Sequence, residues 1–207
     1  MINPKTFIFI GPSGCGKGTQ VELLMKHYTE TGDFSTENPA LHAESGKRFR
    51  DFVKQENFIA QEAKRSINRG ERLPDSLAVW NWAGYLIENY TGREHLIFDG
   101  SPRSLLEAKS LDIMIKFLKR EKPAVIYLEV SEEESLKRLL KRAGEQGRAD
   151  DNQEEIKRRL GWFEKDVKPV LEFYQNEPPY VFLAINGEQS REKIHEDIIT
   201  EIKKAGI

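Results

Sequence analysis

The chain has 207 residues, of which 32 are basic and 34 acidic, so its formal net charge is −2. This length allows one domain with its own core, and the near-neutral charge gives no general attraction to nucleic acid. The single cysteine, Cys15, excludes an internal disulfide and a cysteine-rich zinc site, and no apolar run approaches the roughly 18 residues that span a membrane. We therefore expect a soluble, cytoplasmic, monomeric protein without nucleic-acid or membrane partners.

Short β-rich runs alternate with longer helical patterns along the chain, which is typical of an α/β fold with a parallel sheet. Strands are predicted at residues 6–10, 95–99, 124–130 and 180–185, with a weaker candidate at 40–43. Helices are predicted over 17–30, 47–69, 75–90, 104–120, 132–142, 152–175 and 190–204. The chain is therefore expected to form a single domain with a five-stranded parallel sheet flanked by helices.

The first predicted strand runs into a glycine-rich turn and then into Lys17. The glycines let successive backbone N–H groups point at an anion, and the start of the following helix adds positive potential. Lys17 supplies a full charge to the outer phosphates of a nucleotide, and Thr19 supplies the hydroxyl that Mg²⁺ needs, although Gly18 separates the two. The turn is thus a P-loop for a nucleoside triphosphate, formed by Gly14, Cys15, Gly16, Lys17, Gly18 and Thr19.

The narrower form Gly14-x-Gly16-Lys17-Gly18-Thr19-Gln20 resembles the loop of the adenylate kinase family, the nucleoside monophosphate kinases. This resemblance implies a P-loop NTPase fold with a helical monophosphate-binding insertion over 31–90 and a LID over 143–150. Both segments would lie at the ends of the strands, where open α/β sheets bind ligands, and could act as moving covers. The LID is short, so the resemblance is to short-LID members.

The segment 97–112 resembles the family's Asp-Gly-Phe-Pro-Arg stretch, with Ser101 in place of the aromatic residue. Asp99 ends a buried strand and is expected to orient water on Mg²⁺, while Arg103 matches the arginine that grips the acceptor phosphate. Residues 44–50 resemble the family's Ser-Thr-Gly-Asp-x-x-Arg stretch, with Lys47 in place of the acid. The resemblance implies that the acceptor is bound by Ser45, Arg50, Glu71, Arg72, Leu73, Gly100, Ser101, Pro102, Arg103, Glu107, Arg148 and Arg159.

Four arginines complete the resemblance. Arg138 and Arg142 are four residues apart, so they share one face of a predicted helix, and Arg148 and Arg159 can converge if the next helix starts early. Arginine suits such a site because its planar fork holds phosphate oxygens at two points. Resemblance to the family assigns the catalytic role to Lys17, Arg103, Arg138, Arg142, Arg148 and Arg159, with Arg138 and Arg142 also binding ATP.

The implied reaction is the Mg²⁺-dependent transfer of the γ-phosphoryl group from ATP to AMP. An acceptor phosphate is already anionic, so no general base is needed, and catalysis would rest on positioning and charge neutralisation. Closure of the two covers would exclude water. Two other classes stay open: a P-loop ATPase that drives assembly without an acceptor, and a small-molecule kinase, which would need a base for its acceptor hydroxyl.

The choice of base is also open. Family adenylate kinases carry glutamine four residues after the acceptor arginine, where this chain has Glu107. A carboxylate can only accept hydrogen bonds, which suits the donor edge of guanine or the amino group of cytosine, whereas a pairing with Arg103 or Lys109 would leave base reading to backbone groups. AMP is the first prediction, with GMP or UMP and CMP as alternatives.

Two further patterns bear on the site. Leu77, Trp80, Gly84 and Ile87 are spaced helically, which favours Trp80 as a core residue rather than a base-stacking platform. The four histidines are scattered without metal-ligand spacing, and we assign them no chemistry.

Overall fold

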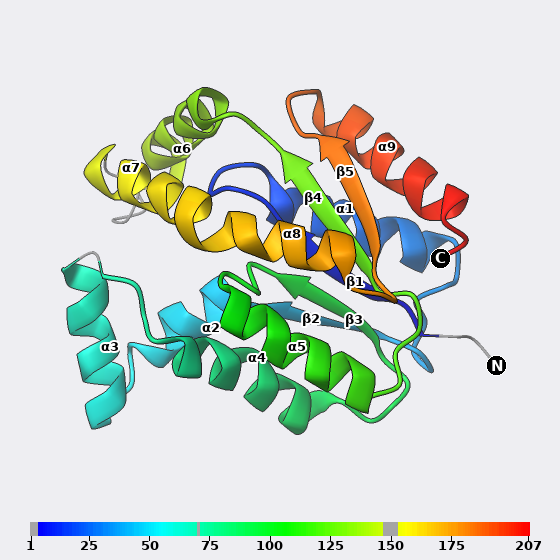
Figure 1. The fold of residues 1–207 in the computed structure, drawn as a ribbon, viewed down its shortest axis with the longest axis horizontal. Helices are drawn as coiled ribbons and strands as arrows, with labels where there is room; N and C mark the ends of the chain where they lie inside the picture. Colours follow the sequence, from blue (N-terminus) through cyan, green and yellow to red (C-terminus); the bar gives the residue numbers. More distant parts are fainter. Residues whose placement is uncertain (1–3, 70, 147–152) are drawn as a thin grey trace.

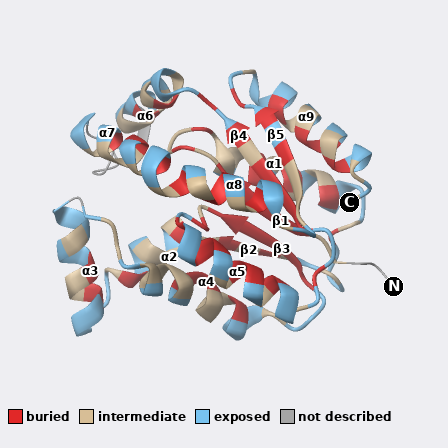
Figure 2. Ribbon diagram, in the orientation of Figure 1, coloured by how far each residue is buried: buried red, intermediate tan, exposed pale blue. Residues whose placement is uncertain are grey.

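The computed structural model describes residues 4–69, 71–146 and 153–207 and shows one twisted parallel sheet between two layers of helices (Figure 1). Its strands, all parallel, lie in the order β2-β3-β1-β4-β5. They are β1 (Thr6–Ile10), β2 (Ala40–Glu44), β3 (His95–Asp99), β4 (Ala124–Glu129) and β5 (Val181–Asn186). The predicted fold class is confirmed, including the weak strand candidate. β1 and β3 are buried along their whole length, as expected for central parallel strands (Figure 2).

Each face of the sheet carries its own apolar core. The first core includes Leu24 and Ile198 and lies between the sheet and two helices, α1 (Lys17–Glu30) and α9 (Arg191–Lys204). Trp82 and Leu111 belong to the second, on the opposite face. The helices of that second layer are α4 (Asp75–Asn89), α5 (Leu105–Phe117) and α8 (Lys168–Asn176). Because helices pack on both faces, the sheet is held rigidly, and so are the loops at the carboxyl ends of its strands.

The helix predicted over 47–69 is two helices, α2 (Ser45–Phe52) and α3 (Phe58–Asn68). Asn57 ends the intervening turn, and its side chain accepts a hydrogen bond from the backbone N–H of Ala60, which caps α3. The two helices share a small core of Phe52, Ala60 and Ala63 that is separate from the cores on the sheet. The span 31–90 therefore contains one sheet strand, one helix packed on the sheet layer, and two short helices, of which α2 also contacts α4.

The prediction for Trp80 is wrong. Trp80 is 45% exposed and packs against Phe52 of α2 with tilted rings whose centroids are 4.7 Å apart, whereas Trp82 is the buried tryptophan. The sheet-facing stripe of α4 runs through Val79, Trp82, Ala83 and Leu86. The stripe that contains Trp80 lies on another face of α4, where Ile87 is 79% exposed.

The segment predicted as the helix 152–175 contains α7 (Gln153–Trp162), a π-helical turn (Phe163–Val167) and α8. Pro169 lies in the first turn of α8, where it needs no backbone N–H. The helix α6 (Glu132–Gln146) continues four residues beyond its predicted end at 142. The predicted LID thus begins in the last turn of α6, and residues 147–150, with Arg148, lie outside the described residues.

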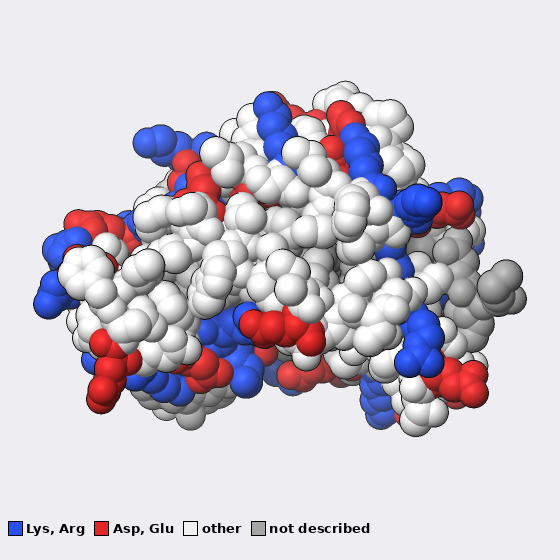
Figure 3. Space-filling view, turned by 90° about the horizontal axis from the view of Figure 1, so that it is seen from below, with Lys and Arg blue, Asp and Glu red and all other residues white. Residues whose placement is uncertain are grey.

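On the face of the molecule that carries α3 and α4, charges of both signs are mixed rather than gathered into a field of one sign. Seen from the side of α3 and α4, acidic and basic side chains lie next to one another in small groups around a broad area that carries neither (Figure 3). Within residues 4–69, 71–146 and 153–207, no helix is both long and apolar enough to cross a bilayer.

Candidate active site

The P-loop lies at the carboxyl end of β1 and leads into α1, whose first residue is Lys17. Gly14 has φ +85°, and a Cβ there would lie 2.8 Å from the Ser135 carbonyl oxygen, so only glycine lets the loop approach α6 this closely. The Lys17 ammonium donates to the carbonyl oxygens of Gly11 at 2.8 Å and Pro12 at 3.0 Å. Since these partners are neutral, a phosphate can replace them.

Asp99 ends β3 beside this loop, with its carboxylate 3.7 Å from the position that a Cβ on Gly18 would take. Burial would raise the pKa of Asp99, but the nearby His42 and the charges of Lys17 and Arg103 outweigh it and hold the pKa below its usual value. The His42 ring lies 3.8 Å from the carboxylate. Asp99 is therefore ionised and faces the start of α1. A residue that orients metal-bound water needs this charge and this position.

The acceptor side is formed where β2 and β3 end next to each other. The Ser45 hydroxyl donates to the carbonyl oxygens of Gly100 at 2.9 Å and Asp99 at 3.2 Å, which ties the start of α2 to the end of β3. Gly100 has φ +77°, and a Cβ there would lie 2.8 Å from an Arg103 Nη atom and 2.9 Å from the Ser45 hydroxyl. The Arg103 guanidinium therefore packs over Gly100, and its Nε donates to the Gly100 carbonyl at 2.6 Å.

The Arg103 side chain is exposed to solvent. The neighbouring protein still removes part of its hydration, which lowers the pKa of Arg103. The charges of Glu107 and Asp99 raise this pKa, and those of Arg159 and Arg72 lower it. The structure thus brings two other arginines predicted to bind the acceptor, Arg72 and Arg159, within electrostatic reach of Arg103. Such a group of cations suits two phosphate groups that must be held close together.

Arg50 points from α2, where its guanidinium lies 3.2 Å from the carboxylate of Glu44. Both side chains are exposed, so the pair is weak. In the turn before α4, Glu71 pairs with Arg69 rather than with another predicted site residue. Leu73 packs on the small core of α2 and α3.

Glu107 is 1% exposed, and its Oε2 accepts the backbone N–H of Arg103 at 2.6 Å. Burial raises the pKa of Glu107, although the Arg103 backbone N–H and the nearby Ser101 hydroxyl lower it. Ser104 caps α5 by accepting the backbone N–H of Glu107. Glu107 is thus part of the cap of α5, and it shapes the loop Gly100–Ser101–Pro102 that precedes Arg103.

The helix α6 carries two of the predicted arginines, and the first of them contacts the P-loop. Arg138 donates to the carbonyl oxygens of Gly187 at 2.9 Å and Cys15 at 3.4 Å, and its Nε donates to Glu134. It therefore joins the P-loop to the connection after β5. Arg142 follows one turn later on α6 and is half-buried.

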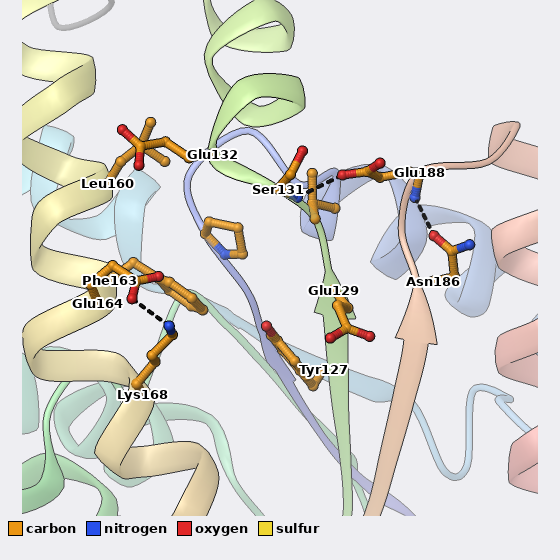
Figure 4. Close-up of a pocket in the computed structure, with 12 residues that line it drawn as sticks. Tyr127, Glu129, Ser131, Glu132, Leu160, Phe163, Glu164, Lys168, Asn186 and Glu188 are labelled. Carbon is orange, nitrogen blue, oxygen red and sulfur yellow. Dashed lines mark hydrogen bonds and ion pairs between the residues drawn. The ribbon is translucent and has the colours of Figure 1, made fainter.

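A half-open pocket of about 520 Å³ lies beside the P-loop at the ends of β4 and β5 (Figure 4). Four glutamates and one lysine are among its lining residues: Glu129, Glu132, Glu164, Glu188 and Lys168. An excess of carboxylates repels phosphate. This pocket is therefore not a candidate for the phosphate site, which the sequence predicts at the P-loop and the arginines.

Comparison with known proteins agrees with this geometry. The family model for adenylate kinase matches residues 9–178. The chain is 35% identical to an adenylate kinase of Bacteroides fragilis over 92% of this chain and 94% of that protein. It is 34% identical to one of Leptospira biflexa, over 96% of this chain and all of that protein, and 32% identical to one of Phocaeicola vulgatus, over 95% and 97%.

This chain belongs to the adenylate kinase family. The enzyme is therefore a nucleoside monophosphate kinase, which confirms the fold, family and reaction class that the sequence predicts. The roles of individual residues stay predictions.

Three side chains at this adenylate kinase site escaped the sequence analysis. His42 lies beside Asp99, Glu44 pairs with Arg50, and Asp166 of the π-helical turn pairs with Arg72. The alternation of β2 and its position at the sheet edge could have placed His42 and Glu44 on one face. No local pattern pointed to Asp166, which lies 94 positions from its partner in the chain.

Proposed function

We propose that this enzyme transfers the γ-phosphoryl group of Mg-ATP to AMP and that the residues around the P-loop and Arg103 carry the reaction. The observation that carries this proposal is the gathering of Lys17 and Arg103 around the ionised Asp99, with Arg159 near Arg103. A single ATP needs the P-loop lysine, whereas the group around Arg103 provides cations for a second phosphate.

In this mechanism Lys17 leaves its carbonyl partners and holds the β- and γ-phosphates against the N–H groups of the P-loop. Arg103 and Arg50 hold the acceptor phosphate in line with the γ-phosphate. Arg138, Arg142 and Arg159 neutralise the charge that spreads over the transferred group. No proton has to be removed from the acceptor, since its attacking oxygen is already anionic.

Mg²⁺ suits the donors of this site. Thr19 offers a hydroxyl, and Asp99 offers an ionised carboxylate that can hold metal-bound water. Within the described part of the chain, no three His, Cys, Asp or Glu side chains gather into a metal-binding group. We therefore expect the ion to take most of its ligands from phosphates and water. An ion held there by Thr19 and Asp99 would supply positive charge against the phosphates of ATP.

The helical pair α2 and α3 is proposed as the cover of the monophosphate, and the segment between α6 and α7 as the cover of ATP. The two helices share a small core that is separate from the two cores on the sheet. Closure of both covers would exclude water and suppress hydrolysis of ATP.

AMP is the proposed acceptor because Glu107 is already engaged. Its Oε2 holds the Arg103 backbone, and the side chain is buried. GMP is the second candidate, because Glu107 Oε1 is buried without a hydrogen-bond partner and guanine offers two donors.

The test is an assay of the purified protein with Mg-ATP and each of AMP, GMP, CMP, UMP and dAMP, with each diphosphate measured directly. We expect ADP to form from AMP and the other acceptors to react poorly. A preference for GMP that Glu107→Gln shifts to AMP would make Glu107 the reader of the base. Consumption of ATP at the same rate without an acceptor would indicate an ATPase instead.

A further inference from the structure

A chain of hydrogen bonds and ion pairs joins three segments that are far apart in the sequence. Arg72, in the turn before α4, forms an ion pair with Asp166 in the π-helical turn at 3.0 Å and donates a hydrogen bond to Asp75 at 2.7 Å. Asp75 also accepts the hydroxyl of Ser104 at 2.8 Å. Ser104 is the N-cap of α5, the helix that begins directly after Arg103.

The contacts continue to the acceptor arginine. Ser104 accepts the backbone N–H of Glu107 at 3.1 Å, and Glu107 accepts the backbone N–H of Arg103 at 2.6 Å. Ser104 and Glu107 are buried, and the Arg72, Asp75 and Asp166 side chains are only 24–30% exposed. Partly shielded contacts of this kind, with charges at both carboxylates, are stronger and more rigid than pairs on an open surface.

Asp166 connects this chain of contacts to the segment that follows α7. The π-helical turn follows α7 directly, and α7 carries Arg159. Arg72 is therefore held between the helix that carries one phosphate-site arginine and the loop that carries another. Its guanidinium pairs with Asp75 within its own turn and with Asp166 in the π-helical turn, so it links the turn 71–75 to the segment that follows α7.

We propose that Asp166 is a positioning residue for the acceptor monophosphate: through Arg72 and Asp75 it holds the turn 71–75 and the start of α5 in the geometry that binds the acceptor. This inference rests on the proposed function, since it concerns the monophosphate site. Asp166 touches neither substrate in this account and acts only through Arg72.

The test compares Asp166→Asn with wild type. The substitution keeps the shape of the side chain and removes its charge, so the ion pair with Arg72 is lost. We expect the KM for AMP to rise about three- to tenfold, while kcat and the KM for ATP stay within about twofold. The loss of a partly exposed ion pair changes a binding affinity by roughly tenfold or less. Titration calorimetry with AMP alone should show the same loss of affinity.

Glu164→Gln is the matched control. It removes a carboxylate from the same π-helical turn, but Glu164 pairs with Lys168 on its own helical segment. We expect both KM values to stay at the wild-type level. In a background of Arg72→Gln, Asp166→Asn should have no further effect on the KM for AMP, since its partner is already gone.

An unchanged KM for AMP in Asp166→Asn would overturn the inference, as would equal rises in both KM values or additive effects in the double variant. A fall in thermal stability with unchanged AMP affinity would show a merely structural role and also overturn it. Failure of the proposed function would be seen separately, as wild-type protein that does not phosphorylate AMP.

Discussion

The cations proposed to bind phosphate are held by partners that a phosphate can displace. Lys17 and Arg103 donate to backbone carbonyl oxygens, which carry no full charge. Phosphate oxygens form stronger, charge-assisted hydrogen bonds with the same groups. These side chains are therefore already near the positions that a bound nucleotide requires.

Arg50 differs, because its partner Glu44 is a carboxylate that competes with the acceptor phosphate. We expect Glu44→Gln to lower the KM for AMP about two- to threefold with an unchanged kcat, since the exposed pair is worth less than about 1 kcal/mol. Steady-state kinetics at low salt should show the effect best. A raised KM would mean that Glu44 supports the acceptor site instead.

Gly100 is a position where one added carbon atom should disturb the acceptor site. We expect Gly100→Ala to raise the KM for AMP at least about tenfold, because the new Cβ would meet Arg103 and Ser45 at under 3 Å. It should also lower the free energy of unfolding by about 1 kcal/mol, because φ is +77°.

Gly92→Ala is the control for Gly100→Ala. Gly92 has φ +99°, and a Cβ there would meet nothing within 4 Å. This variant should lose similar stability in urea unfolding but keep the wild-type KM for AMP. An equal change of KM in both variants would argue that backbone strain, and not the contact with Arg103, causes the effect.

At the scale of single elements, the strands were easier to predict than the helices. The apolar run of β1 and its glycine-rich turn predict a buried strand followed by a turn into a helix at Lys17, and the structure has both. The helix predicted over 47–69 failed because the break lacks glycine or proline and depends on the cap that Asn57 provides. Trp80 was misplaced because α4 has two apolar stripes, and only packing against the sheet decides which one is buried.

The cap of α3 can be tested directly. We expect Asn57→Ala to destabilise α3 by about 1 kcal/mol, since it removes the acceptor for the Ala60 N–H. Amide hydrogen exchange should show faster exchange in the first turn of α3, while the strands keep their protection. Asn89→Ala, which removes a donor at the last turn of α4, should leave exchange in α3 unchanged. Unchanged exchange in Asn57→Ala would show that tertiary packing alone holds this helix.

At the scale of the whole molecule, the parallel sheet explains why distant motifs meet. The carboxyl ends of β1, β2 and β3 lie at one edge, which brings the P-loop, Ser45 and Asp99 together. The motifs of the sequence predicted this gathering. The contacts of Arg72 with Asp166 and of Asp99 with His42 could not be predicted, because they depend on how helices and strands approach each other in space.

A buried histidine at the amino end of β3 makes the stability of the protein depend on pH. His95 is fully buried, and its Nδ1 accepts the backbone N–H of Lys5 at 2.9 Å. Burial, with the charges of Arg120 and Lys5, lowers the pKa of His95 to about 4. The folded state thus keeps His95 neutral where an unfolded chain, with a pKa of about 6.5, would bind a proton.

Stability from His95 is therefore present above pH 6.5 and is lost as the pH falls toward 4. Between pH 7.5 and 5 we expect a loss of about 2 kcal/mol in the free energy of unfolding, measured with urea. His95→Asn keeps an acceptor but cannot titrate, so it should show a smaller loss over the same range. An equal loss in both proteins would assign the pH dependence to other groups.

The central claim is that the γ-phosphoryl group passes to a nucleoside monophosphate and not to water. The most direct measurement is a single-turnover reaction with ATP labelled at the γ-phosphate, with and without AMP, in the presence of Mg²⁺. We predict that the label appears in ADP when AMP is present, that little appears as inorganic phosphate without it, and that Lys17→Met slows the transfer at least about 100-fold. Release of the label as inorganic phosphate at the same rate with and without AMP would contradict the account.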